Sequence, residues 1–164
     1  MRKTVLVFLL ITFSVVAQEE TKQAPNFSLK SLEGNQVELS SYLGNGPVLI
    51  SFWATWCKPC VAELKYFNEY YNEFKEQGFT MLAVSTDSER SVSKVRPFVK
   101  ANNYNFPVLL DTNSEVARMY YARMIPYTVI LDKSGNIVYT HVGYKKGDEL
   151  EVKEIIEKLL SESK

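Results

Sequence analysis

Apolar and polar residues follow two different rhythms along this chain, and each rhythm predicts a kind of secondary structure. Short, mostly apolar runs of strand length stand at residues 47–53, 79–85, 106–110, 127–131 and 137–142. Apolar residues at helical spacing predict helices after Pro59 and over residues 91–102, 114–121 and 148–160. Because strands alternate with helices along most of the chain, the sequence predicts a layered α/β fold.

A small β-hairpin is predicted ahead of these elements. Residues 27–30 and 37–39 alternate between apolar and polar side chains on the two sides of residues 32–35, a turn-forming segment that contains Gly34. We therefore expect a short antiparallel pair of strands before the alternating strands and helices.

The N-terminus has the pattern of a secretory signal peptide. Arg2 and Lys3 give a basic start, and residues 5–17 are then almost wholly apolar. This run is shorter than the about 20 residues that a spanning helix needs, so we expect residues 1–17 to be removed on export. An uncleaved N-terminal membrane anchor is the alternative. Polar residues 18–23 are then a flexible lead-in to one domain over residues 24–164. Export, to the periplasm, would place that domain in an oxidising compartment.

Composition excludes some classes of function. The 164 residues include 19 basic and 19 acidic side chains, and the formal net charge is zero. Since no basic patch with interleaved aromatic residues is present, we expect no nucleic-acid partner. The length suits one domain with a core of its own. An exported chain with just two cysteines is more typical of a redox protein than of a disulfide-stapled scaffold.

The two cysteines form a CxxC motif, Cys57-Lys58-Pro59-Cys60, between a predicted strand and a predicted helix. Cys60 heads the apolar stripe of that helix, which continues with Leu64, Phe67, Tyr71 and Phe74. Cys57 lies about one turn earlier, where free backbone N–H groups, the helix dipole and the charge of Lys58 favour a thiolate. We therefore expect Cys57 to be the nucleophile and Cys60 to be the buried resolving thiol.

Two other interpretations of the cysteine pair find little support. A structural zinc site normally has four ligands, whereas the chain offers two cysteines and one histidine, His141. A purely structural disulfide across so short a loop would restrain the unfolded chain only weakly. We therefore expect a redox site without a metal.

Glu63 and Ile125-Pro126 are further candidates, and for each the residues alone leave an ordinary interpretation open. Glu63 lies at the edge of the apolar helix face, where partial burial would raise its pKa and make it a proton acceptor for Cys60. Otherwise Glu63 reaches solvent or pairs with a lysine. Ile125-Pro126 precedes a predicted strand, where a cis bond could expose backbone groups to a client peptide. An ordinary trans proline in a turn is what the sequence alone favours there.

Taken together, these motifs resemble those of the exported TlpA-like and ResA-like thiol-disulfide oxidoreductases of the thioredoxin superfamily. The resemblance covers residues 24–160 and is carried by residues 24–29, 52–60, 106–111 and 127–135, with Ile125-Pro126 at the position of the family's cis-proline. It implies a thioredoxin-like α/β fold. In that fold helices flank a central mixed β-sheet, and an N-terminal β-hairpin and a central insertion are added.

The resemblance also implies roles for individual residues. Glu63 matches the family's acidic acid/base position, and Ser51 stands where cytoplasmic thioredoxins keep a buried aspartate. Pro126 matches the cis-proline of the client groove. The other groove residues implied are Trp56, Lys58, Pro59, Met124, Ile125 and Tyr127. Met124 and Tyr127 are bulkier than the residues usual at their positions, so a client preference does not carry over.

The function implied by the resemblance is the reduction of disulfides in client proteins outside the cytoplasm, with apocytochrome c in cytochrome c maturation among the family's clients. The redox-active disulfide is the only cofactor implied. Beside the client protein, the partner implied is a membrane thiol-electron donor of the CcdA or DsbD kind, and we expect a monomer. One alternative is a peroxiredoxin-like (AhpC/TSA) peroxide reductase, although Ala54 stands where such enzymes keep a threonine. The other is a non-catalytic module that binds clients.

Overall fold

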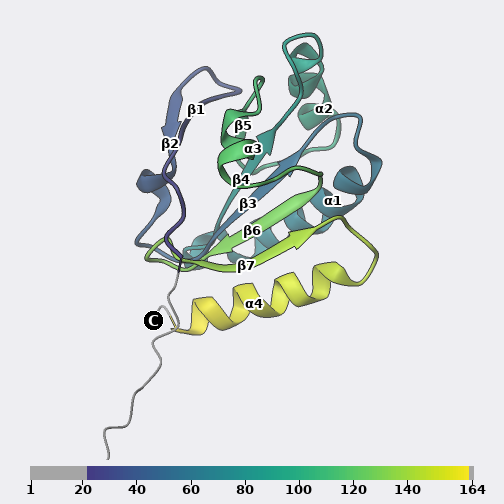
Figure 1. Ribbon diagram of the computed structural model, residues 1–164. Helices are drawn as coiled ribbons and strands as arrows, with labels where there is room; N and C mark the ends of the chain where they lie inside the picture. Colours follow the sequence, from purple (N-terminus) through teal and green to yellow (C-terminus); the bar gives the residue numbers. More distant parts are fainter. Residues whose placement is uncertain (1–21, 163–164) are drawn as a thin grey trace, which may run out of the picture.

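The computed structural model describes residues 22–162, in which seven strands form one mixed sheet (Figure 1). The order of the strands across the sheet is β2-β1-β5-β4-β3-β6-β7. Their bounds are β1 Ser28–Ser31, β2 Gln36–Glu38, β3 Val48–Trp53, β4 Thr80–Ser85, β5 Val108–Leu110, β6 Tyr127–Leu131 and β7 Ile137–Val142. All five predicted strands and the predicted hairpin, β1 and β2, are confirmed.

The sheet has three parallel strands at its centre and antiparallel strands on both sides of them. β3, β4 and β5 run parallel, because the chain crosses over between them through helices. β6 pairs antiparallel with β3, and β7 pairs antiparallel with β6. On the other side, β1 pairs antiparallel with β5 and carries β2 at the edge. The predicted mixed sheet is confirmed, and its centre brings the end of β3 beside the start of β6.

In the described part of the chain, four α-helices and three short 3-10 helices flank the sheet. They are η1 Leu39–Tyr42, α1 Lys58–Phe74, η2 Lys75–Gln77, η3 Val92–Lys94, α2 Val95–Ala101, α3 Glu115–Met119 and α4 Asp148–Glu162. The segment predicted as one helix over residues 91–102 starts as η3 and becomes α-helical at Val95, which leaves Pro97 in the first turn. α3 is shorter than predicted and ends before Tyr121, whose φ of 59° lies in the left-handed region.

The two faces of the sheet bury separate apolar clusters. On one face Leu49 and Trp53 of β3 pack with residues of α1, α2 and α4. On the other face Val48, Ile50 and Phe52 of the same strand pack with α3 and the N-terminal segment. Figure 1 shows α3 on the near side of the sheet and α1 on the far side. Because both faces are covered, β3 is buried along its whole length.

The expected signal peptide, residues 1–17, and most of the expected lead-in lie outside the described residues. At the first described positions the backbone already pairs with the turn between β6 and β7. Ile137 donates its N–H to the carbonyl of Lys22 at 2.9 Å, and Gln23 forms a bridge with Asn136. The backbone of Lys22 and Gln23 is therefore paired with the start of β7 and the residue before it. Within residues 22–162, no helix has the length and apolar character that crossing a membrane requires.

Candidate active site

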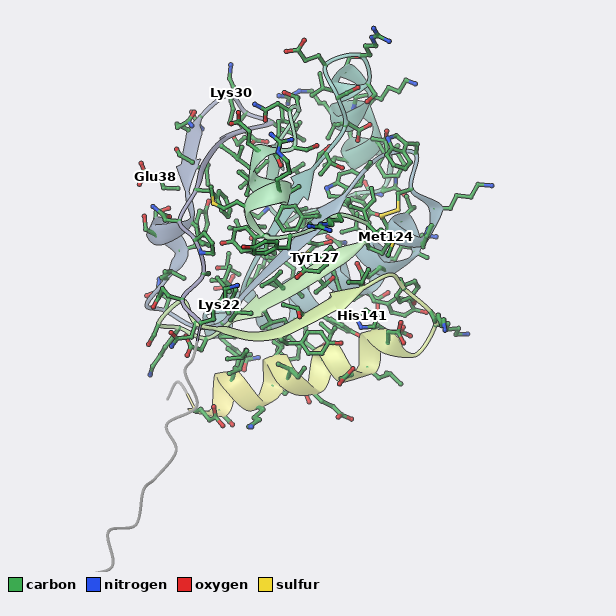
Figure 2. The ribbon with its side chains drawn as sticks, in the orientation of Figure 1. Lys22, Lys30, Glu38, Met124, Tyr127 and His141 are labelled. Carbon is green, nitrogen blue, oxygen red and sulfur yellow. A yellow bond between two sulfur atoms is a disulfide. The ribbon has the colours of Figure 1, made fainter. Side chains whose placement is uncertain are left out.

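The CxxC motif lies where β3 ends and α1 begins, as the sequence predicts. Cys57 is the N-cap residue of α1, and its Sγ accepts the N–H of Cys60 at 3.3 Å. Pro59 stands in the first turn, where its missing N–H costs no helix hydrogen bond. Cys57 and Cys60 are joined by a disulfide, seen as a yellow bond near Met124 in Figure 2. Cys57 is 5% exposed and Cys60 is wholly buried, so an incoming sulfur can approach Cys57 more readily.

A buried carboxylate at the end of β4 holds the loop before the motif. Asp87 accepts the backbone N–H of Thr55 and its hydroxyl, both at 2.8 Å. The hydroxyl of Ser85 donates to the same carboxylate at 3.1 Å. These bonds tie the loop that carries Trp56 and Cys57 to the neighbouring strand. Sequence analysis missed Asp87, and its position two residues after a predicted buried strand was the available signal.

Glu63 is buried more deeply than the sequence predicts. Its side chain is only 2% exposed, among the buried residues of α1. The Thr128 hydroxyl lies 3.3 Å from each Glu63 carboxylate oxygen and is the hydrogen-bond donor of the pair. Burial raises the pKa of Glu63 to about 8, while the Thr128 bond lowers that pKa and the charge of Asp148 raises it. A carboxyl group with this pKa can hold or release a proton near neutral pH.

The apolar stripe of α1 also differs in one position from the predicted one. Tyr70, and not Tyr71, is the buried tyrosine. The Tyr70 hydroxyl donates to the carbonyl of Glu149 at 3.1 Å, because α4 packs against that side of α1. Because α4 covers this side of α1, the buried face of α1 includes Glu63 as well as Tyr70. The Glu63 carboxyl group is therefore not at the edge of the apolar face.

Ser51, at the position where the resemblance would place an aspartate, lies on the same side of the sheet as Glu63. It is wholly buried and pairs across the strands with Thr128, the residue that bonds to Glu63. Among the described residues its hydroxyl has no hydrogen-bond partner. The polar cluster Ser51, Thr128 and Glu63 therefore has one ionisable member, and that member is Glu63.

Replacing Thr128 with valine is expected to raise the pKa of Glu63 further. Valine keeps the shape of threonine but removes the hydroxyl that favours the ionised carboxylate. Since hydrogen bonds to charged groups are worth about 1.5–3 kcal/mol, the titration midpoint should rise by about one to two pH units. Carboxyl carbon-13 shifts of the oxidised protein would measure it. Thr140→Val on β7 serves as the control, and an unchanged midpoint in Thr128→Val would contradict the assigned bond.

Two hollows lie on the two sides of Ile125, beside the disulfide. The peptide bond between Ile125 and Pro126 is cis, in agreement with the resemblance. The first hollow, here called the Arg118 groove, has a volume of about 600 Å³ and is lined by Trp56, Thr86, Ser114, Ala117, Arg118, Ala122, Arg123, Met124 and Ile125. The second, the His141 pocket, has a volume of about 450 Å³ and is lined by Pro59, Ile125, Pro126, His141, Val142, Gly143, Tyr144, Lys145 and Asp148.

Most of the residues expected in a client groove come together here. Trp56 and Met124 line the Arg118 groove and are 66% and 67% exposed, while Pro59 lines the His141 pocket. Lys58 is exposed beside them but lines neither hollow. Tyr127 does not join this surface. It lines a separate hollow with Lys22 and Tyr121, and its ring packs against Phe52, because alternation along β6 turns it to the other face.

Sequence analysis missed several residues that line these hollows. His141 lies in the pocket beside Pro126, with its Nε2 3.2 Å from an Asp148 carboxylate oxygen (Figure 2). Arg118 and Arg123 come from α3 and the following loop, and no local pattern marks them. Within residues 22–162, no group of three or more His, Cys, Asp or Glu side chains could hold a metal ion.

Known proteins are similar to this chain in sequence and in fold. The family model described as the AhpC/TSA family matches residues 21–140. The thiol-disulfide oxidoreductase ResA of Bacillus thuringiensis subsp. konkukian is 37% identical over 130 residues, which are 79% of this chain and 73% of that protein. The ResA protein of Bacillus subtilis is 37% identical over 124 residues, 76% of this chain and 68% of that protein.

Solved structures with a similar fold point to the same class of protein as the sequence relatives. A Chlorobium tepidum protein with the proposed identity of thiol:disulfide interchange protein DsbE superposes with a TM-score of 0.79 at 26% identity, over 88% of this chain and 99% of that one. The thioredoxin domain of a thiol-disulfide oxidoreductase from Bacteroides vulgatus gives a TM-score of 0.69 at 26% identity, over 85% and 99%. The chain therefore belongs to the AhpC/TSA family, as a thioredoxin-like, ResA-like thiol-disulfide oxidoreductase whose CxxC active site is the Cys57–Cys60 disulfide.

Proposed function

We propose that this chain reduces disulfides in client proteins outside the cytoplasm, with Cys57 as the nucleophile and Cys60 as the resolving thiol. The observation that supports the proposal is that the two sulfurs differ in position on the helix and in exposure. Cys57 caps the N-terminus of α1 and is the more accessible, whereas Cys60 is wholly buried one turn later. The helix N-terminus favours a thiolate at Cys57, which is the attacking form in disulfide exchange.

The reaction transfers two electrons from the protein dithiol to the client disulfide and proceeds in two thiol-disulfide exchanges. The Cys57 thiolate attacks one sulfur of the client disulfide, forms a mixed disulfide and releases the other client sulfur as a thiolate, which takes up a proton. The Cys60 sulfur then attacks Cys57 Sγ, which restores the Cys57–Cys60 disulfide and releases the second client thiol. The client disulfide is reduced and the protein dithiol is oxidised.

Glu63 is proposed as the proton acceptor for Cys60. Cys60 is buried, and burial in apolar surroundings disfavours a thiolate, so its attack requires a nearby base. Glu63 lies one turn after Cys60 on the buried side of the same helix, and its pKa of about 8 suits proton transfer near neutral pH. Pro126 and the two hollows beside it are proposed to hold the client segment, with Trp56, Pro59, Met124 and Ile125 in contact with it.

The family resemblance supports the proposed location and partners. We propose that residues 1–17 direct export to the periplasm, as a cleaved signal peptide or as an uncleaved anchor, and that residues 24–164 act as a monomeric domain. Since the reduced form must be regenerated in an oxidising compartment, the proposed electron donor is a membrane thiol transporter of the CcdA or DsbD kind. Apocytochrome c, with its pair of haem-binding thiols, is the proposed client.

The reduction potential of the Cys57–Cys60 couple tests the direction of electron flow. We expect a value below about −220 mV, near that of thioredoxin and far from the about −120 mV of a strong oxidant. The measurement equilibrates the purified protein in dithiothreitol or glutathione buffers and quantifies the thiols. A potential near −120 mV would make the chain a disulfide donor and contradict the proposed direction. Rapid consumption of hydrogen peroxide by the reduced protein would instead support the peroxide-reductase alternative.

A further inference from the structure

The Arg118 groove carries positive charge that no side chain of the groove neutralises. Arg118 and Arg123 line it, and its lining contains no carboxylate. Both arginines are exposed, and neither takes part in an ion pair among residues 22–162. Arg118 uses one Nη1–H to bond to the carbonyl of Asn113 at 2.8 Å, which leaves most of its five N–H donors available.

The buried carboxylates on neighbouring segments are held by other partners. Asp111 accepts the backbone N–H groups of Val116 and Ala117, at 3.3 and 2.8 Å, and so caps the helix that carries Arg118. Asp87, next to the groove residue Thr86, is bonded to Thr55 and Ser85. Since the whole chain has no net charge, the positive character of this groove is local.

The lining of the groove includes residues that are next to the reactive disulfide and the cis-proline in the sequence. Trp56 directly precedes Cys57, Met124 and Ile125 directly precede Pro126, and all three line the groove. Figure 2 shows Met124 at the same end of the molecule as the yellow disulfide. A client segment that brings its sulfur to Cys57 therefore lies against the exposed Trp56 and Met124 side chains. The guanidinium groups of Arg118 and Arg123 lie within reach of its flanking residues.

We propose that the Arg118 groove selects client segments that carry Asp or Glu within a few residues of the disulfide cysteine, together with an apolar residue against Trp56 and Met124. The planar guanidinium group binds carboxylates with two parallel hydrogen bonds, and the paired charges accelerate encounter at low salt. This inference rests on the proposed disulfide exchange at Cys57. It adds a preference that the resemblance does not supply, because Met124 is unusual at its position.

The test uses three short synthetic peptides that differ only in charge. Each contains one cysteine as a mixed disulfide with 2-thiopyridine, and the second and third positions on both sides of it are all Glu, all Gln or all Lys. Attack by Cys57 on the peptide sulfur releases pyridine-2-thione, whose absorbance gives the rate. Cys60 then displaces the peptide thiol, so the protein dithiol supplies both electrons. The reduced wild-type protein is also assayed with 2-hydroxyethyl disulfide, which has no charge.

The wild-type protein is expected to react about fivefold faster with the Glu peptide than with the Gln peptide at low ionic strength, and slowest with the Lys peptide. This ratio should approach one at about 0.3 M salt, because salt screens exposed charges. In Arg118→Glu/Arg123→Glu the order of the three peptides should reverse. Arg96→Glu/Lys133→Glu makes the same change in net charge at exposed positions outside the groove and should keep the wild-type order.

Two results would overturn the inference alone. One is a wild-type Glu to Gln ratio of one or less, and the other is an unchanged ratio in the groove variant. A wild-type protein that reduces neither the peptides nor 2-hydroxyethyl disulfide would instead contradict the proposed exchange reaction, and the groove preference with it.

Discussion

Replacing Cys57 with serine is expected to lower the rate of disulfide reduction by at least about 1,000-fold, because a serine hydroxyl remains protonated at neutral pH and cannot take part in disulfide exchange. Replacing Cys60 with serine should block turnover as well, but for a different reason. Cys57 can still attack the client disulfide, and no second thiol is present to release the client. The Cys60→Ser protein should therefore accumulate a mixed disulfide through Cys57.

Mass spectrometry of the two variants after mixing with a peptide disulfide separates the roles of the two sulfurs. The adduct is expected on Cys57 in Cys60→Ser, and far less adduct is expected on the buried Cys60 in Cys57→Ser. Each variant keeps a single thiol, so the position of an adduct is unambiguous. An adduct that forms faster on Cys60 would reverse the assignment of nucleophile and resolving thiol. Circular dichroism of both variants controls for loss of the fold.

Replacing Glu63 with glutamine is expected to remove a pH dependence of stability. In the folded protein the pKa of Glu63 is about 8, against 4.5 for an unperturbed carboxyl group. Below about pH 4.5 the group is protonated in both states, so it does not change the free energy of unfolding with pH. Between about pH 4.5 and 8 the unfolded chain binds fewer protons than the folded one, and the free energy of unfolding falls as the pH rises.

The expected fall attributable to Glu63 is about 5 kcal/mol, since one pKa unit corresponds to about 1.4 kcal/mol, and it should level off above about pH 8. Urea unfolding of the oxidised wild-type and Glu63→Gln proteins between pH 4 and 9 would measure the difference, with the cysteines held in the disulfide. Glu69→Gln is the matched control, because it changes an exposed carboxyl group of the same helix. Parallel curves for wild type and Glu63→Gln would show that burial does not raise this pKa.

The same substitution should also slow the second exchange of the reaction. Without a carboxylate beside it, Cys60 loses its proposed proton acceptor, so the mixed disulfide with the client should persist longer in Glu63→Gln than in the wild type. The formation of the mixed disulfide at Cys57 should be affected less, because Cys57 lies at the N-terminus of α1, one turn before Cys60. The two effects can be separated by following adduct and free client thiol in a single turnover.

Much of the fold could be predicted because its signals are local. The runs at β3 and β4 are short, mostly apolar segments, and their length and their β-branched and aromatic residues favour buried strands. The CxxC motif, the Pro59 that starts α1 and the stripe from Cys60 onward lie within one helix length of each other. The ends of helices are harder to predict from sequence. α3 is an example, because Tyr121 adopts a left-handed conformation that no residue preference indicates.

The environment of Glu63 and the lining of the Arg118 groove depend on contacts between residues that are far apart in the sequence. The spacing of residues along the chain is enough to indicate where the two thiols stand, which of them caps the helix and that a carboxyl group follows one turn later. The burial of Glu63, in contrast, depends on long-range packing, because the antiparallel register of β3 and β6 brings Thr128 to it and α4 packs on the same side. Likewise, the meeting of Arg118 and Arg123 with Trp56 depends on how α3 and its loop pack beside the end of β3. Desolvation and local charge are properties of that packing, and no spacing along the chain encodes them.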